Sequence, residues 1–437
     1  MRIKLALLGI AIMSAAAAAP RKSAEVTFYK DVLPVLQKNC QECHRAGEAA
    51  PVQFFTYKET RPWAKAMKEA VLSKRMPPWF ADPHVGKFTN DRTMPADDVN
   101  TLISWVDGGA KEGSAKDAPP PRQFQQGWII GKPDMVFELP EPAEVAATGT
   151  IEYTYFIVPT SFTEDKWIQL AEARPGNRAV VHHIIAFVRD PQSKWLRDYP
   201  AGKAFIPKGN RGGGDGGMGG EFLSGFAPGA PPEMLRTGQG KKIRAGSDIV
   251  FQMHYTTNGK AAVDQSKLGI IFSKEPPTQR VLTLAAQNGK FVIPPGAPAY
   301  AVDGAITLHA DSELISLLPH MHLRGKSMEM RAVYPTGETE KLVWVPGYDF
   351  NWQLWYQVPQ GKIIPKGTRI EATGTFDNSA NNKSNPDPTK EVRWGDQSWE
   401  EMMIGFFNVA VDVKADPMQL LRPPKKPAAA TTTGTEE

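Results

Sequence analysis

The sequence predicts a multi-domain protein in which a small all-α domain is followed by two tandem all-β sandwich domains. Apolar residues recur with helical spacing in residues 25–115, and short alternating apolar runs dominate residues 132–413. A Pro-rich stretch separates these two regions. The 437 residues are enough for two to three domains of about 150 residues each. The 38 Gly and 38 Pro residues also favour a loop-rich, largely β protein.

The first 19 residues have the pattern of a signal peptide. Arg2 and Lys4 precede an apolar run at residues 5–13, and the alanines at 15–19 supply a small-residue cleavage zone. This apolar run is too short to remain as a membrane-spanning anchor. We therefore expect a periplasmic or secreted protein that has no membrane anchor after cleavage.

Both cysteines of the chain lie in the run Cys40-Gln41-Glu42-Cys43-His44. At this spacing, two thiols bond to the vinyl groups of a haem and the following histidine binds its iron. A zinc site would need a second cysteine pair or an equivalent fourth ligand. A thioredoxin-like redox pair would follow a strand, whereas this run follows a helical pattern at residues 28–37. The sequence thus predicts one covalent haem c in a cytochrome c-like domain over residues 25–115.

Two helical patterns frame this predicted haem domain. The apolar face of the first consists of Phe28, Val32, Leu33, Val35 and Leu36. The second covers residues 96–110 and resembles the C-terminal helix of cytochrome c domains, which packs across the first helix. A linker is predicted at residues 116–131, where three consecutive prolines lie at 119–121.

The sixth ligand of the haem iron is predicted to be Met76, which lies in a Pro-rich loop. Met94, at the start of the last helical pattern, is the main competitor, and His84 is a third candidate. Ligation by methionine and histidine saturates the iron and raises its potential, which suits electron transfer.

The β region is predicted to form two sandwich domains, at residues 132–268 and 269–413. Alternating runs bounded by Pro, Gly, Asn and Asp occur at residues 153–159, 180–188, 249–255, 314–318 and 403–411. The Gly-rich stretch at 209–220 predicts a flexible loop. Residues 422–437 consist mainly of Pro, Ala, Lys and Thr and predict a disordered tail.

Five of the eight histidines fall in three motifs within this β region. The motifs are His182-His183, His254-Tyr255 and His320-Met321-His322. Histidines two apart on a strand share one face, whereas adjacent ones point to opposite faces unless a bulge turns both toward one ion. Imidazole groups without thiolates suit copper or zinc.

The order of these motifs, followed by Glu401-Met402, resembles the copper type II, ascorbate-dependent monooxygenases. Peptidylglycine α-hydroxylating monooxygenase and dopamine β-monooxygenase are the familiar members of that family. The resemblance covers roughly residues 130–412. The segments at 348–353 and 385–388 are similar to bacterial relatives in which this module follows a haem c domain.

The resemblance implies two tandem jelly-roll domains with two copper ions, too far apart to share one oxygen molecule. By motif, one set of ligands would hold the electron-storing copper, namely His182, His183 and His254. The other would hold the oxygen-binding, catalytic copper, namely His320, His322 and Met402. A thioether ligand suits the cuprous state. Met403 is the rival of Met402, and the Glu-Met alignment favours Met402.

The chain also departs from the family. The disulfides of the animal enzymes are absent because both cysteines belong to the haem motif. Leu318 and Phe406 occupy positions where peptide-amidating members have an arginine and a tyrosine for the substrate carboxylate. A neutral or apolar small-molecule substrate is therefore expected.

The sequence as a whole predicts a periplasmic copper-dependent monooxygenase that hydroxylates a C–H bond with O2. The fused haem c would supply electrons taken from an external donor. The alternative is a non-catalytic electron-transfer or copper-binding fusion protein. The net charge of +4 is small and the basic residues are scattered among acidic ones, so no nucleic-acid partner is expected.

Overall fold

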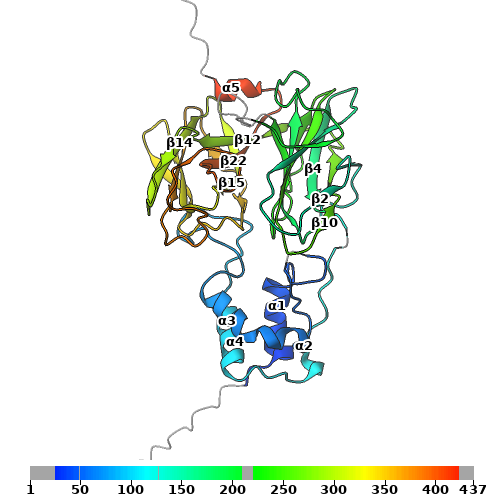
Figure 1. The fold of residues 1–437 in the computed structure, drawn as a ribbon, viewed down its shortest axis with the longest axis vertical. Coiled ribbons are helices and arrows are strands. Elements are labelled where there is room, and N and C mark those ends of the chain that lie inside the picture. The colour runs from blue at the N-terminus through cyan, green and yellow to red at the C-terminus, as the bar shows by residue number, and fades with distance from the viewer. Residues whose placement is uncertain (1–24, 49, 126, 209–219, 423–437) are drawn as a thin grey trace, which may run out of the picture.

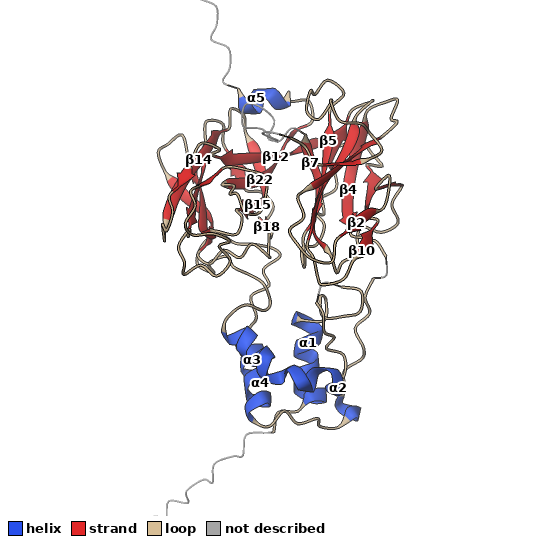
Figure 2. Cartoon of the chain, viewed as in Figure 1, coloured by secondary structure: helices blue, strands red, loops and turns tan. Residues whose placement is uncertain are grey.

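The computed structural model describes residues 25–48, 50–125, 127–208 and 220–422, and most of its regular structure is β-sheet. A helical segment, residues 25–117, lies below two β units that stand side by side (Figures 1 and 2). The predicted signal peptide, nearly all of the Gly-rich loop and nearly all of the tail lie outside the described residues. None of the helices within the described ranges has the length and apolar character that a membrane crossing requires.

The helices are short and, apart from one, belong to the helical segment. They are η1 (Phe28–Val32), α1 (Leu33–Asn39), α2 (Tyr57–Thr60), η2 (Arg61–Trp63), α3 (Ala64–Leu72), α4 (Ala96–Asp107), η3 (Ala115–Asp117) and, near the end of the chain, α5 (Pro417–Leu421). Trp105 of α4 packs against Phe28 of η1, with ring centroids 6.0 Å apart. The Trp105 indole N–H also donates a hydrogen bond of 2.8 Å to the Lys111 carbonyl, so this buried ring has no unpaired polar atom.

Trp105→Ala is expected to lower the free energy of unfolding of the helical segment by about 3–5 kcal/mol. The reason is that Trp105 is fully buried, at 0% exposure, and its removal leaves a cavity among the helices. Trp63→Ala is the matched control, because Trp63 is 45% exposed and its truncation should change stability by no more than about 0.5 kcal/mol. Denaturant unfolding followed by the circular dichroism of the helices measures both variants. Equal losses in the two variants would contradict the placement of Trp105 in this core.

The first β unit, β1 to β11, contains a five-stranded sheet that carries three of the candidate metal ligands. Its strand order is β6 (Ala204–Phe205), β3 (Thr154–Pro159), β9 (Asp248–Tyr255), β5 (Val181–Arg189) and β7 (Glu221–Phe226). A hydrophobic core lies between this sheet and a second sheet, with Phe156, Phe251 and Leu268 among its buried members. The unit is therefore a β-sandwich.

The second sheet has nine strands and continues from the first β unit into the second, β12 to β22. Its order is β1 (Met135–Glu138), β11 (Lys267–Phe272), β4 (Lys166–Arg174), β8 (Gln239–Ile243), β12 (Gln279–Gln287), β22 (Ile404–Asp412), β15 (Ser312–His320) and β18 (Tyr356–Gln357), and β19 (Ile363–Ile364) also pairs with β15. The link between the units is a short parallel pairing of β8 with β12, at Gln239↔Gln279 and Gly240↔Arg280.

A four-stranded sheet completes the second β unit. Its order is β14 (Tyr300–Thr307), β20 (Arg369–Phe376), β16 (Gly325–Val333) and β17 (Thr339–Val345). Two small sheets pair β2 (Ala143–Val145) with β10 (Ala262–Asp264), and β13 (Val292–Ile293) with β21 (Val392–Arg393). The core of this unit includes Phe376, Phe407 and Met403, all fully buried.

The predicted fold class, a small all-α cytochrome c domain followed by two tandem all-β jelly-roll domains, is wrong. The structure is mainly β-sandwich, only 12% of it is helical, and it contains no cytochrome-like all-α domain in the part of the chain that it describes. One physical reason is that the chain between α3 and α4 leaves the helices and packs into the second β unit. Another is that a shared nine-stranded sheet joins the two β units, which are therefore not separate sandwiches.

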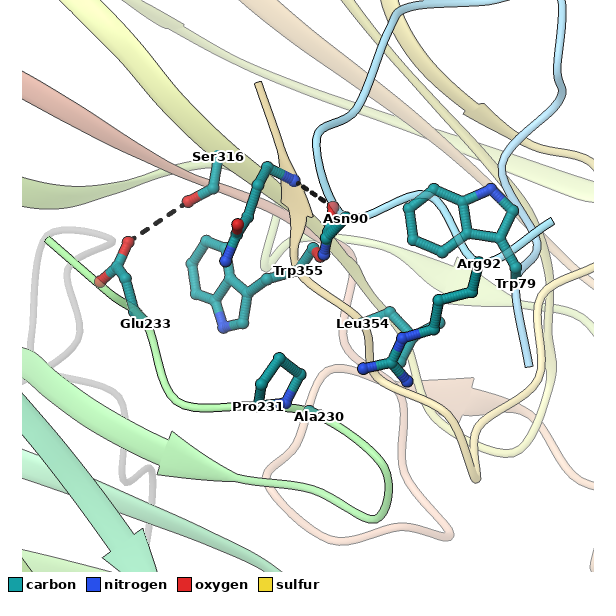
Figure 3. Close-up of a pocket in the computed structure, with 10 residues that line it drawn as sticks. Trp79, Asn90, Arg92, Ala230, Pro231, Glu233, Ser316, Leu354 and Trp355 are labelled. Carbon is teal, nitrogen blue, oxygen red and sulfur yellow. Dashed lines mark hydrogen bonds between the residues drawn. The ribbon is translucent and has the colours of Figure 1, made fainter. Parts of the chain in front are cut away.

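The segment between α3 and α4 is anchored on the second β unit by both main-chain and side-chain contacts. Its main chain donates from Asp82 N to Trp344 O at 2.8 Å and from Thr89 N to Gln357 O at 2.8 Å. Trp79 packs edge-on against Tyr356, at 4.9 Å between ring centroids. Asn90 lies near Trp355 (Figure 3) and donates to the carbonyl of that residue at 2.7 Å. The helical segment therefore shares its apolar contacts with the β structure.

Candidate functional site

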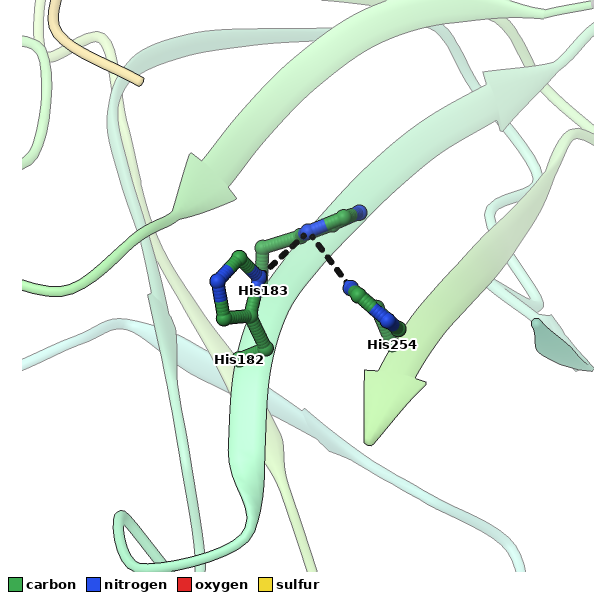
Figure 4. Close-up of side chains that lie close together, drawn as sticks. All are labelled: His182, His183 and His254. Atoms are coloured by element: carbon green, nitrogen blue, oxygen red, sulfur yellow. Dashed lines mark hydrogen bonds between the residues drawn. The ribbon is translucent and has the colours of Figure 1, made fainter. Parts of the chain in front are cut away.

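Three of the predicted ligands, His182, His183 and His254, form one group, which we call the three-histidine cluster. His183 of β5 lies directly opposite His254 of the neighbouring strand β9. The register of this pairing shifts between Val181 and His183, so His182 occupies an irregular position in the ladder. A bulge of this kind re-aims a side chain, which allows two adjacent histidines to turn toward the same point. Figure 4 shows the three rings converging from the two strands.

The geometry of the three-histidine cluster fits a single metal ion. One ring nitrogen from each histidine lies within 4.8 Å of the others. The Nδ1 atom of His183 is 3.3 Å from the Nδ1 atom of His182 and 3.3 Å from that of His254. Three imidazole nitrogens without a thiolate form a ligand set that suits copper or zinc.

Burial keeps these imidazoles in the neutral form that binds metal. Together with the neighbouring His182, which has a smaller effect, burial lowers the pKa of His254 to about 3. The pKa of His183 falls well below its usual value because the ring is buried beside other histidines. The pKa of His182 is lowered as well, mainly by burial. Around neutral pH, no proton therefore competes with a metal ion for these nitrogens.

Residues that the sequence analysis did not select surround the cluster. The Tyr153 ring lies 5.3 Å from the His183 ring and 4.6 Å from the His254 ring. The Ser398 hydroxyl is 3.4 Å from His254 Nε2 and 3.4 Å from the Tyr153 hydroxyl. Ser398 belongs to the second β unit. A loop of that unit therefore contacts the three-histidine cluster, whose histidines lie on strands of the first β unit.

His320 and His322 form a second group, which we call the paired histidines. Their ring centroids are 5.3 Å apart and the rings are nearly perpendicular. His320 Nδ1 is 2.8 Å from Gln353 Oε1, and His322 Nδ1 is 3.2 Å from the Glu400 carbonyl oxygen. Because both partners are oxygen acceptors, each Nδ1 carries the proton, and each Nε2 is left as a lone-pair donor. Bonds of this type hold metal-binding histidines in the required tautomer.

Glu401 holds the backbone that carries the paired histidines. Its fully buried carboxylate accepts hydrogen bonds from the His322 N–H at 2.8 Å and the Arg324 N–H at 2.6 Å. Burial raises the pKa of this carboxyl to about 8. Glu401, the first residue of the Glu401-Met402 motif, therefore has a structural role: it holds the backbone at His322.

Met402 and Met403 lie in different surroundings. Met402 is half-buried and packs with Leu318, Ile404 and Phe406, and the Phe406 ring is 5.8 Å from the His320 ring. Met403 is fully buried in the core of the second β unit. Consecutive residues of an extended chain point to opposite sides, which explains this separation. Of the two, Met402 lies on the side of the paired histidines.

The three-histidine cluster and the paired histidines are neighbours across one aromatic ring. The buried Phe350 ring stacks on His182 at 5.2 Å between centroids and 14° between planes. The same ring lies 5.9 Å from the His322 ring, at 82°. Phe350 therefore fills the space between the two groups.

The Cys40–His44 run has features that fit a covalent haem. Both thiols are free, and burial raises the pKa of the Cys40 thiol to about 12. His44 Nδ1 is 3.1 Å from the Val52 carbonyl oxygen, which leaves Nε2 available to an iron ion. The His44 ring stacks on Phe54 at 4.2 Å.

The two methionines considered as the sixth iron ligand also differ in their surroundings. Met94 is half-buried and packs against the core of the helical segment, as does Cys40. Within the described residues, that core does not include Met76, which lies in the turns after α3, just before the chain reaches the second β unit. His84 is exposed. The fold therefore places Met94, rather than the predicted Met76, in the same packed core as Cys40.

Comparisons with known proteins give no family assignment. No family model matches the chain, and no curated protein matches it. Among solved structures, the infectious bursal disease virus VP2 subviral particle is 11% identical, with a TM-score of 0.19, over 67% of this chain and 75% of that one. The Gt strain of the same virus gives 10% identity and a TM-score of 0.20, over 67% and 74%. Similarity at this level supports no conclusion about this chain.

Proposed function

We propose that the protein is a copper-dependent monooxygenase that hydroxylates a C–H bond of a small molecule with O2. The observation that carries this proposal is the presence of two groups of imidazoles, most of them buried, that both contact the Phe350 ring. The proposal includes one haem c, attached to Cys40 and Cys43 and bound by His44, which passes on electrons from an external donor. Covalent haem attachment also favours a periplasmic or secreted location.

Each group has its own role in this proposal. His182, His183 and His254 would hold one copper, and His320, His322 and Met402 would hold the other. When bound, the two coppers supply two electrons and the place where O2 is activated. Gln353 and the Glu400 carbonyl fix the tautomers of the paired histidines, and the buried Phe350 ring contacts both groups. Leu318 and Phe406, close to His320, favour an apolar substrate.

A second candidate is a copper-binding electron-transfer protein that turns over no substrate. The burial of Phe350 favours it, because this ring occupies space between the two groups that a substrate would need. Oxygen uptake that depends on an added small molecule distinguishes the two functions. The enzyme requires such uptake, whereas the electron-transfer protein shows none.

Copper titration of the metal-free protein tests the ligand assignment. The wild type is expected to bind two copper ions, and His183→Ala one, because His183 lies between the other two histidines of the cluster. His84→Ala is the matched control, since His84 is exposed and should leave both copper ions in place. Electron paramagnetic resonance of bound Cu(II) counts the sites. Two copper ions on His183→Ala would contradict the assignment.

A further inference from the structure

Two adjoining hollows extend from Cys43 of the haem-binding run to Trp355, which lies two residues after Gln353. The first is lined by Cys43 of the helical segment and by Arg178 and the turn at residues 229–232 of the first β unit. Arg92 lines it as well. If haem c were attached, the sulfur of Cys43 would be bonded to the porphyrin, and this hollow would adjoin that point of attachment.

The second hollow continues from the first toward the second β unit. Arg92, Ala230 and Pro231 line both hollows and so form their common wall. Arg92 is fixed in this wall because its guanidinium donates to the Gly229 carbonyl at 2.6 Å. The second hollow is also lined by Leu354 and Trp355 (Figure 3).

Trp355 is connected to His320 in two ways. Gln353, two residues earlier on the same loop, accepts the hydrogen bond from His320 Nδ1. The Trp355 indole also packs against the group that contains Leu318 and Phe406, and the Phe406 ring is 5.8 Å from the His320 ring. The loop is held in place by Asn90, which donates to the Trp355 carbonyl at 2.7 Å and accepts from Gln357 N at 2.9 Å.

We propose that Trp355 is the bridge for electron transfer from the haem c edge at Cys43 to the copper held by His320 and His322. With both groups bound, the transfer would move one electron: ferrous haem iron would be oxidised to ferric, Cu(II) would be reduced to Cu(I), and no bond would form or break. None of the five candidate copper-binding histidines is among the described residues that line these two hollows. The paired histidines are assigned as the acceptor because Gln353, on the Trp355 loop, is hydrogen-bonded to His320, and because Trp355 packs with Phe406 beside the His320 ring. This inference rests on the proposed function.

Single-electron injection into the complete protein, loaded with haem and Cu(II), tests the bridge. A light pulse with a soluble photoreductant reduces the haem without oxygen, and visible absorption then follows the return of ferric haem. Trp355→Leu is expected to slow this return about tenfold, which corresponds to about 1.4 kcal/mol in activation free energy. The visible spectrum of the haem and the electron paramagnetic resonance spectrum of Cu(II) should not change, because the Trp355 indole binds neither iron nor copper.

Trp79→Leu is the matched control, because Trp79 lines the same second hollow but packs on Tyr356 and Phe88. It should keep the wild-type rate, and equal slowing of both variants would overturn the proposal. A wild-type rate in Trp355→Leu would also overturn it and leave the proposed function intact. Absence of copper-dependent haem oxidation in the wild type would contradict the proposed function itself. If Trp355→Leu does not fold, Trp355→Phe takes its place, with slower transfer expected and an unchanged rate overturning the proposal.

Discussion

Met402→Ile is expected to abolish hydroxylation while the haem spectrum and the copper of the three-histidine cluster stay unchanged. The substitution removes the thioether sulfur, which is the ligand suited to a cuprous ion. It largely preserves side-chain volume at a half-buried position, so the loss of folding stability should stay under about 1.5 kcal/mol. Substrate-dependent oxygen uptake, product analysis and copper titration together measure the effect.

Met403→Ile is the matched control for this prediction. Met403 lies in the core of the second β unit, so the same exchange there should lower stability without removing a copper ligand. Hydroxylation is therefore expected to persist in the Met403 variant under conditions in which it remains folded. Full turnover by Met402→Ile, or loss of turnover by Met403→Ile alone, would contradict the assignment of Met402.

Replacing both Cys40 and Cys43 with alanine is expected to remove all covalent haem and to leave copper binding intact. Both thiols belong to the helical segment, whereas the histidine groups lie in the β units. Hydroxylation driven by the external donor should stop in this variant. It should return when a small reductant such as ascorbate is added, because the copper ligands remain in place.

Haem staining after denaturing electrophoresis, copper analysis and oxygen uptake check this second prediction. Gln37→Ala provides a control within the helical segment, since this half-buried side chain donates a hydrogen bond to the Pro120 carbonyl and is neither a haem nor a copper ligand. Donor-driven turnover at the wild-type rate in the double-alanine variant would contradict the role of the haem c. Loss of both copper ions in that variant would contradict the expectation that copper binding does not depend on the attached haem.

The local features of the site could be predicted from sequence because they depend on neighbouring residues. The adjacent His182 and His183 required a bulge to share one ion, and the register of β5 with β9 shifts at that position. The alternation of side chains along an extended chain also separates Met402 from Met403. These expectations needed only strand geometry and the order of the motifs.

Contacts between distant parts of the chain were not predictable in this way. Phe350 and Ser398 reach the three-histidine cluster from loops of the second β unit, and no periodic pattern marks either residue. The nine-stranded sheet depends on a pairing of only two residues each from β8 and β12. The fold class was predicted incorrectly for a similar reason. Helical spacing at residues 25–115 gives no sign that Trp79, between the helices, packs on Tyr356 of the second β unit.

Metal analysis of the protein, matured in a periplasm that attaches haem c, tests the central claim most directly. The proposed function predicts two copper ions for each covalent haem. Chelation should remove both copper ions together with hydroxylation, and the visible haem spectrum should remain. One haem without copper, even after copper loading, would contradict the claim and leave the histidine groups as structural features of the two β units.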